Sequence, residues 1–192
     1  MQKLLGVILC GGESKRMGSD KGLIEKDGEP WALLAAKKLT GIGIPVMISI
    51  SEKQLESYSQ FFPRDMLIAD NVGIEGPLKG LLSVYENYPE SDILLMACDL
   101  VDMDEETIGQ LVKHYNPQSQ HHFYVYHDQF AEPFCAIYTA KGIQPVYQKA
   151  KANSLEKFSF QRILEDDKTF RIPILNKSAF RNYNTIEGHH QQ

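Results

Sequence analysis

The sequence lacks several patterns that assign a chain to a class of protein directly. It has three cysteines in 192 residues, Cys10, Cys98 and Cys135, and no two of them form a C-x-x-C pair. That spacing signals neither a zinc site nor a disulfide framework, and it fits a reduced cytoplasm. No apolar run approaches the roughly 18 residues of a membrane helix, and no charged segment with a cleavage site opens the chain. We therefore expect a cytoplasmic protein with no membrane partner.

Positive charge is also scarce. The net charge is −5, and no run of basic residues is longer than two. A nucleic acid is therefore not an expected partner, because its backbone needs an extended basic surface. A small phosphorylated ligand needs only a local positive site, so that class of ligand stays open. Repeats and low-complexity segments are absent as well, which excludes a solenoid.

Apolar runs predict an α/β fold. The chain has the length of one such domain, which buries roughly 70% of the surface of its unfolded chain. The runs at 3–9, 46–51, 66–68 and 93–98 are apolar, as in the buried strands of parallel sheets. The run at 93–98 is the most apolar after the first, so we place it at the sheet centre. Because strands alternate with helical patterns, we predict a doubly wound, mostly parallel sheet.

Helical patterns lie between the expected strands. We expect helices from Pro30 to the Gly41–Gly43 turn, over 53–62, from the Gly76–Pro77 loop through Tyr85, and over 105–115, 142–152 and 159–166.

The second half of the chain is less regular. Runs at 122–126 and 135–138 are typical of strands, and the connection at 128–133 is too short for a helical crossover, so the pair is expected to be antiparallel. This makes the sheet mixed. A further strand is expected at 170–172, on an edge. No linker separates the two halves, so we predict a single domain over 1–192.

The strongest chemical signal lies between Leu5 and Leu23. An apolar run leads into Gly11 and Gly12, and then Lys15, Arg16 and Lys21 follow within eleven residues of Gly11. Adjacent glycines let backbone N–H groups approach an anion, and the cations neutralise its charge. The stretch therefore predicts a phosphate-binding loop. It has neither the Walker spacing nor G-x-G-x-x-G.

Residues 9–21 instead match L-x-G-G-x-S-x-R-M-G-x-D-K, a signature of the nucleotidyltransferases that make nucleotide-activated sugars and cofactors. Within that superfamily the chain most resembles the molybdenum cofactor guanylyltransferases, which join GMP from GTP to molybdopterin. The resemblance is dense over 4–23, 68–80, 92–99 and 180–185. It implies the Rossmann-like nucleotide-diphospho-sugar transferase fold, with a nucleotide-binding half over about 1–115 and an acceptor-side half over about 116–188.

The same resemblance implies GTP and molybdopterin, or Mo-molybdopterin, as substrates and Mg²⁺ as the cofactor. Delivery of the acceptor by other proteins of the pathway is left open.

Asp99 is the expected magnesium ligand and a catalytic residue. It directly follows the central strand, at the edge where open α/β sheets bind ligands, and a metal that neutralises phosphates needs a carboxylate there. The family carries a C-D pair at this point, as Cys98–Asp99 does here. Arg16 and Lys21 are the other predicted catalytic residues, since they would stabilise the departing pyrophosphate. Lys15 is expected to be a surface charge.

Two nearby acids, Asp102 and Asp104, are expected to cap a helix rather than bind a metal.

The nucleotide side of the site draws on several loops. Asp70 follows the third expected strand, and by resemblance it binds the guanosine. Ser49 stands where the family has an asparagine, and Gly76–Pro77 belongs to a G-P-L-x-G that the family also carries. The predicted nucleotide-binding residues are Leu9, Cys10, Gly11, Gly12, Lys21, Ser49, Asp70, Gly76, Pro77 and Asp99.

The acceptor side is expected near the C-terminus. Asn182-x-Asn184-Thr185 matches an N-x-N-T that the family uses close to molybdopterin and the metal, and side chains two apart on an extended segment point the same way. An ordinary turn stabilised by asparagines is the open alternative. Glu132–Pro133 resembles a family motif whose role here is open.

Guanine is the expected base. Its edge has two N–H donors beside an acceptor, and we expect the turn at 9–12 to offer both carbonyls and N–H groups to it. Guanylyltransferases of this family carry L-x-G-G here, whereas their cytidylyl relatives tend to T-A-A-G. The alternatives are a CTP-dependent molybdopterin cytidylyltransferase, a sugar-phosphate nucleotidyltransferase, which is usually longer, and a GTP-binding regulator, which would need a Walker-type loop.

Overall fold

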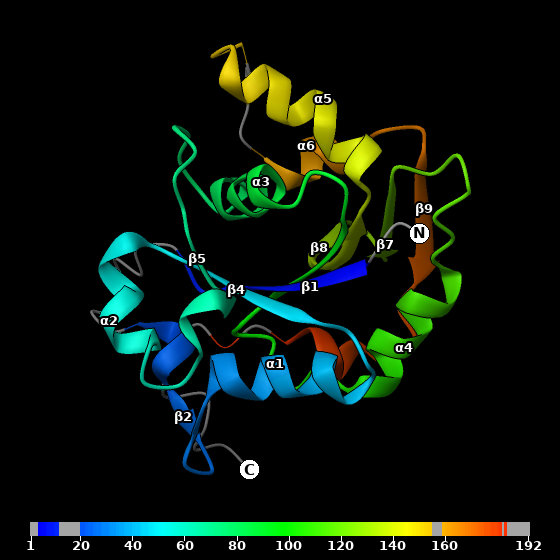
Figure 1. The fold of residues 1–192 in the computed structure, drawn as a ribbon. Helices are drawn as coiled ribbons and strands as arrows, with labels where there is room; N and C mark the ends of the chain where they lie inside the picture. The colour runs from blue at the N-terminus through cyan, green and yellow to red at the C-terminus, as the bar shows by residue number, and fades with distance from the viewer. Residues whose placement is uncertain (1–3, 12–19, 155–158, 182, 184–192) are drawn as a thin grey trace.

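The computed structural model describes residues 4–11, 20–154, 159–181 and 183, and in these a seven-stranded sheet separates two layers of helices (Figure 1). Across the sheet the strands are β5 (Leu67–Ala69), β4 (Val46–Ile50), β1 (Leu4–Leu9), β6 (Asp92–Ala97), β8 (Ala131–Tyr138), β7 (Phe123–His127) and β9 (Thr169–Pro173). β8 runs antiparallel to its neighbours β6 and β7, and the other pairs are parallel. The mixed, mostly parallel sheet predicted from the sequence is therefore confirmed.

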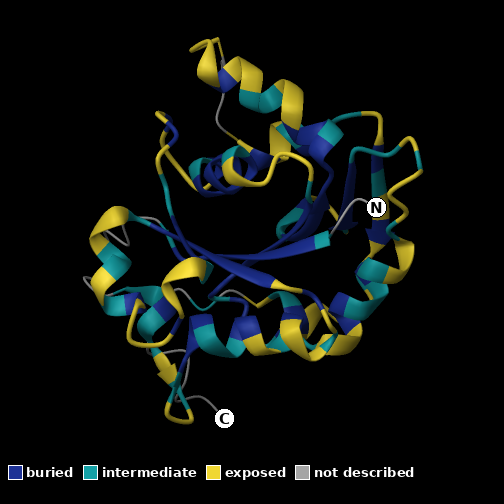
Figure 2. Ribbon diagram, in the orientation of Figure 1, coloured by how far each residue is buried: buried dark blue, intermediate teal, exposed yellow. Residues whose placement is uncertain are grey.

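The helices divide between the two faces of the sheet. One face carries α1 (Trp31–Gly41), α2 (Leu55–Tyr58) and α4 (Glu105–His114), and the other carries α3 (Leu78–Asn87), α5 (Ala140–Lys151) and α6 (Phe160–Leu164) (Figure 1). Each face has its own apolar cluster, so the central strands are buried on both sides, as Figure 2 shows. A strand buried on both faces has no polar alternation, which is why these runs are continuously apolar.

The centre of the sheet sets the geometry of the candidate site. β1 pairs with β6 so that Leu9 lies opposite Ala97, and the Cys98 amide donates to the Leu9 carbonyl at 3.2 Å. The residues that follow the two strands, Gly11 and Asp99, therefore emerge at the same carboxyl edge. The central position predicted for the 93–98 run is confirmed.

Three local expectations are corrected. The helix expected over 53–62 is a 3-10 turn (Glu52–Gln54) followed by the single turn of α2. Only Tyr58 and Phe62 of this segment are buried, so packing does not extend the helix. β8 begins at Ala131, inside the expected connection, because Ala131 pairs with His127.

The third correction is a hairpin, β2 (Glu25–Lys26) and β3 (Glu29–Pro30), that precedes α1 and was not expected. Its turn residues Asp27 and Gly28 have φ of 55° and 81°, the left-handed conformation that an Asp-Gly hairpin turn requires.

Within the described residues, no helix combines the length and the apolarity that crossing a bilayer requires.

Candidate active site

Lys21 and Asp99 meet at the carboxyl edge, although 78 residues separate them in sequence. The Lys21 Nζ lies 3.0 Å from the Asp99 Oδ2, and the two side chains keep only 25% and 16% of their surface exposed. Lys21 starts a 3-10 turn (Lys21–Leu23), which Asp20 caps by accepting from the Gly22 amide. The structure thus joins two of the three residues predicted to be catalytic. The third, Arg16, lies outside the described residues, as do Gly12 and Lys15.

The backbone after β1 is already hydrogen-bonded to the protein. The amides of Cys10 and Gly11 both donate to the Ser49 carbonyl, at 2.9 and 3.1 Å, and the Cys10 carbonyl accepts from Gln54 at 3.1 Å. The expectation that this turn offers N–H groups to a base is therefore wrong for the amides of Cys10 and Gly11. Its carbonyls each keep a second lone pair that can accept from a ligand.

Asp70 lies against the glycine turn. Ser49 Oγ donates to Asp70 Oδ1 at 2.8 Å, and a Cβ on Gly11 would come within 2.5 Å of Asp70 Oδ2. Only glycine allows this approach of the carboxylate. Burial raises the pKa of Asp70 to about 6, against the lowering effect of the Ser49 hydrogen bond and of Lys79. The structure thus brings three predicted nucleotide-binding residues, Gly11, Ser49 and Asp70, into one group.

Gly80 joins this group and was not predicted as a site residue. A Cβ on Gly80 would lie 2.5 Å from Ser49 Oγ, so the first turn of α3 can approach Ser49 only because this residue is glycine. The sequence did hold a signal for Gly80, because it is the last residue of the G-P-L-x-G motif. Gly76 and Pro77, the two residues that were predicted, are exposed at the start of α3, where Gly76 has a φ of 82°.

The loop that carries Asp99 is held by both of its neighbouring acids. Asp104 caps α4 by accepting from the Thr107 amide at 2.6 Å, as expected. Asp102 caps no helix, which corrects that expectation. It accepts from the Tyr183 hydroxyl and lies 3.5 Å from the Lys26 Nζ.

Lys38 also fixes this loop, since its Nζ donates to the Val101 carbonyl at 2.6 Å. Burial, with Lys26 nearby, lowers the pKa of Lys38.

Tyr183 brings the C-terminal segment to the same loop. Besides Asp102, it contacts Trp31 edge to face, with 6.2 Å between the ring centroids. Asn182 and Asn184, predicted for the acceptor side, flank it in sequence and lie outside the described residues.

The carboxyl edge offers the carboxylate of Asp99 as a candidate ligand for Mg²⁺. The described residues contain no group of three or more His, Cys, Asp and Glu side chains placed to hold a metal. Mg²⁺ bound with a nucleotide needs fewer, because one or two carboxylates share it with substrate phosphates. Asp99, a carboxylate at the carboxyl edge beside Lys21, fits that requirement.

The cysteines near the site are buried thiols. Burial raises the pKa of Cys10 well above its usual value, and the neighbouring Cys98 adds to the effect. Cys10 therefore keeps its proton and acts as a small apolar residue.

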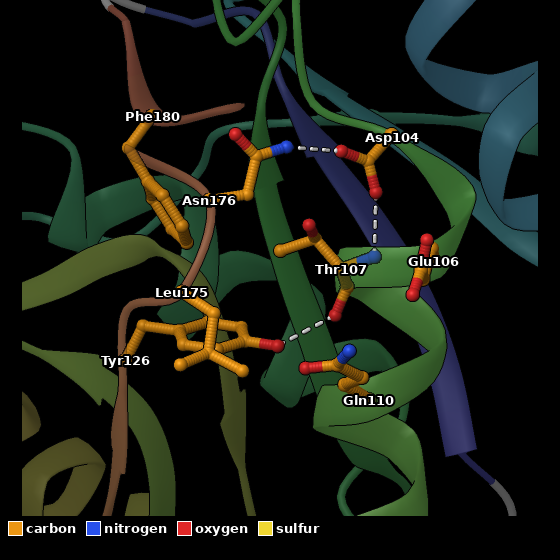
Figure 3. A pocket seen from close by; sticks show the side chains of 8 residues that line it. All are labelled: Asp104, Glu106, Thr107, Gln110, Tyr126, Leu175, Asn176 and Phe180. Carbon is orange, nitrogen blue, oxygen red and sulfur yellow. Dashed lines mark hydrogen bonds between the residues drawn. The ribbon is translucent and has the colours of Figure 1, made fainter. Parts of the chain in front are cut away.

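A surface hollow of about 230 Å³ adjoins Asp104 at the start of α4 (Figure 3). It is formed by the first turns of α4, by β7 and by the segment after β9, and Tyr126 donates to the Thr107 carbonyl within it at 2.7 Å. Its lining residues are Asp104, Glu106, Thr107, Gln110, Tyr126, Leu175, Asn176 and Phe180. None of the predicted site residues lines it, so it is not the candidate site.

An ammonium and a carboxylate held together at the end of a mostly parallel sheet suit a reaction between two phosphorylated substrates, and the chain is a nucleotidyltransferase. Residues 6–167 match the family described as MobA-like NTP transferase domain. The chain belongs to this family.

Similar proteins carry related names. A probable molybdenum cofactor guanylyltransferase from Methanothermobacter thermautotrophicus is 26% identical over 188 residues, which are 94% of each chain. A molybdenum cofactor biosynthesis bifunctional protein from Synechocystis sp. is 30% identical over 151 residues, 77% of this chain and 42% of that protein, so this chain spans less than half of its length. Molybdopterin-guanine dinucleotide biosynthesis protein A from Archaeoglobus fulgidus superimposes with a TM-score of 0.77 at 18% identity, covering 95% of this chain and 93% of that one, and it shares the fold.

Proposed function

We propose that this chain transfers GMP from GTP to molybdopterin, or to Mo-molybdopterin, and releases pyrophosphate, as a molybdenum cofactor guanylyltransferase. The names of the curated relatives and the L-x-G-G signature support this function. The observation that carries it is the Lys21–Asp99 pair, 3.0 Å apart at the edge where the glycine turn ends.

The reaction joins two anions and builds charge on the leaving pyrophosphate. An enzyme accelerates it by holding the two phosphates in line and by neutralising the growing charge. Lys21 and Arg16 donate to the β- and γ-phosphates and stabilise the pyrophosphate as the bond to the α-phosphorus breaks. Asp99 holds the Mg²⁺, which when bound adds positive charge beside the triphosphate.

The guanosine side of the site is formed by the group around Asp70. The second oxygen of the Asp70 carboxylate, against Gly11, can accept from the N1 and N2 donors of guanine, and Ser49 keeps the carboxylate in place. The carbonyls of Leu9 and Cys10 are further acceptors.

Around that group, Gly12 and the Gly76–Pro77 loop complete the proposed nucleotide-binding set. On the acceptor side, Asn182 and Asn184 bind the pterin or its phosphate. Other proteins of the cofactor pathway are candidates to deliver the acceptor.

Base selectivity tests this function directly. Purified protein is incubated with Mg²⁺, a molybdopterin acceptor and each of the four nucleoside triphosphates, and pyrophosphate release is measured. We expect kcat/KM for GTP to exceed that for CTP by roughly 10²-fold, because buried acceptors that match guanine stay unpaired against cytosine. Equal use of the two nucleotides, or a preference for CTP, would overturn the guanine assignment and favour a cytidylyltransferase.

A further inference from the structure

We propose that Gln54 is a positioning residue that, together with Tyr58, ties the two ends of the phosphate loop to each other. The loop leaves β1 at Cys10 and rejoins the described chain at Asp20. Gln54 contacts both points, although it is 44 residues from the first and 34 residues from the second. The effect on turnover rests on the proposed function, in which this loop holds the triphosphate.

The amide of Gln54 uses its full hydrogen-bonding capacity. Its nitrogen donates to the Cys10 carbonyl at 3.1 Å and to Asp20 Oδ2 at 2.5 Å. Its oxygen accepts from the Ser51 amide at 2.7 Å and from the Ser51 hydroxyl at 2.8 Å. A primary amide has two N–H donors and two lone pairs, so each one has a partner here.

No other side chain of this size reproduces that set. Glutamate has no donors for the Cys10 carbonyl and would add a negative charge beside Asp20, and leucine has neither donors nor acceptors. The network also fixes the orientation of the amide, since its oxygen faces the Ser51 N–H and its nitrogen faces a carbonyl and a carboxylate. Gln54 is thus specified by chemistry rather than by packing.

Tyr58 and Gly22 complete the attachment at Asp20. The Tyr58 hydroxyl and the Gly22 amide both donate to Asp20 Oδ1, at 2.9 and 3.0 Å. Burial raises the pKa of Tyr58, so its hydroxyl keeps the proton that it donates. A Cβ on Gly22 would lie 2.1 Å from that hydroxyl, so the contact requires glycine. Asp20 thus accepts three hydrogen bonds with its two carboxylate oxygens. We assign it to holding the end of the loop in place and not to binding the metal.

The residue that is held in place, Asp20, is next in the chain to a predicted catalytic residue. Asp20 directly precedes Lys21, whose ammonium lies 3.0 Å from Asp99. The hydrogen bond from Gln54 restricts the position of Asp20, and with it the backbone from which the Lys21 side chain extends. We therefore expect Gln54 to act mainly on kcat, because charge stabilisation at the leaving group depends closely on where Lys21 sits.

The test compares Gln54→Leu and Gln54→Glu with Gln60→Leu, an exposed glutamine on the same segment. We expect Gln54→Leu to lower kcat by about tenfold or more with a smaller change in KM for GTP, and Gln60→Leu to match the wild type. Tyr58→Phe, which removes a single donor to Asp20, should give a smaller loss in the same direction. Unchanged kcat in Gln54→Leu would overturn the proposal.

Gln54→Glu adds a readout that a merely structural role does not predict. Among the described residues, the titratable groups of this network are Asp20, which accepts from Gln54, Tyr58, which donates to Asp20, and Cys10, whose carbonyl accepts from Gln54. Burial raises the pKa of Tyr58 and of Cys10, so both keep their protons. Beside the Asp20 carboxylate the new glutamate should have a raised pKa, and once protonated it can donate one hydrogen bond to Asp20 in place of the two that the amide donates. Its kcat relative to the wild type should therefore rise by several-fold as the pH falls from 8 to 6, whereas the ratio for Gln54→Leu stays flat. Parallel profiles for the two variants would contradict the proposal.

A measurement without substrate separates this proposal from the proposed function. Amide hydrogen exchange of Gly22, followed by NMR, should accelerate about tenfold in Gln54→Leu, because the acceptor of that amide loses one of its supports. It should stay at the wild-type rate in Gln60→Leu. If Gly22 exchanges faster in Gln54→Leu but the wild-type protein does not use GTP, the proposed function is refuted and the attachment is supported. If the exchange of Gly22 is unchanged, the attachment is refuted whatever the activity.

Discussion

The two halves of the sheet use side chains differently. At the carboxyl edge of β1, β4 and β5, polar groups hold one another, as Asp20 does with three donors and Asp70 does with Ser49. Around β7, β8 and β9 the contacts are aromatic. Tyr138, for example, packs against Phe123 and Phe160 with centroids 5.6 and 5.4 Å apart.

Two buried tyrosines of the second half donate to the backbone. The hydroxyls of Tyr126 and Tyr138 donate to the carbonyls of Thr107 and Pro133 rather than to other side chains. We therefore expect the first half to carry the chemistry and the second half to act mainly as support. Substitutions of the proposed catalytic residues in the first half should change kcat with little change in melting temperature, whereas substitutions of buried residues in the second half should lower the melting temperature with little change in kcat.

Asp99→Asn should show the largest effect. It removes the charge that is proposed to hold the metal beside the phosphates, and it hardly changes the volume. We therefore expect kcat to fall by about 10²-fold or more while the melting temperature stays within a few degrees. Pyrophosphate release over a range of Mg²⁺ concentrations, beside a thermal melt, measures both. Asp128→Asn, on the β7–β8 connection, is the control and should leave kcat unchanged. Near-normal activity of Asp99→Asn at limiting Mg²⁺ would exclude a metal role.

Asp70→Asn should increase the free energy of unfolding, although Asp70 lies in the half of the sheet that contains the candidate site. Burial holds the folded pKa at about 6, above the unfolded value of 3.8, so the stability that this carboxyl contributes is lost as the pH rises from about 4 to about 6. Asparagine can still accept from Ser49 and carries no charge.

At pH 7.5 the free energy of unfolding should therefore increase by roughly 3 kcal/mol, with weaker GTP binding as the accompanying loss. Urea unfolding at pH 7.5 and pH 4 checks the sign, because the gain should vanish at the lower pH. If the free energy of unfolding increases equally at pH 7.5 and pH 4, packing and not the charge of Asp70 is the cause.

Arg16→Ala and Lys21→Ala should each lower kcat by roughly tenfold or more, and by more than they raise KM for GTP. Both cations are proposed to act on charge that grows as pyrophosphate leaves. Lys15→Ala is the matched control on the same loop, and we expect it to change little. Steady-state kinetics that show an effect on KM alone would move Arg16 and Lys21 to ground-state binding.

Tyr126→Phe should give the smallest effect and should confine it to stability. The side chain is 1% exposed and its hydroxyl donates to the Thr107 carbonyl, so its loss should cost about 1 kcal/mol in the free energy of unfolding. Kinetic constants for GTP should match the wild type. A fall in kcat here would mean that the aromatic half takes part in the chemistry, and the contrast between the halves would fail.

The sequence was sufficient wherever a local pattern decides the structure. Continuous apolar runs predicted the central strands, and Asp104 before Glu105 predicted the cap of α4. The shared edge of the glycine turn and Asp99 followed from topology, because residues that follow parallel strands emerge together.

Other features depend on partners that are distant in sequence. Nothing local in Gln54 indicates that it meets Cys10 and Asp20, and a glutamine on a short polar helix usually faces solvent. Asp102 looked like a cap because its actual partners, Tyr183 and Lys26, come from remote segments. In the β2–β3 hairpin the Asp27–Gly28 signal was present, but strands of two residues are too short to show alternation.

The pairing of β1 with β6 has a consequence for how the chain folds. These two strands are neighbours at the centre of the sheet, yet β4, β5 and α3 come between them in sequence. The long loop between them must close before their contacts can form, and such non-local pairing is slow. Since the same pairing brings Gly11 and Asp99 to one edge, refolding should restore nucleotide binding in the same kinetic phase as protection of the central strands. GTP, the proposed substrate, should bind only after that step, so it should slow unfolding and leave the folding rate unchanged.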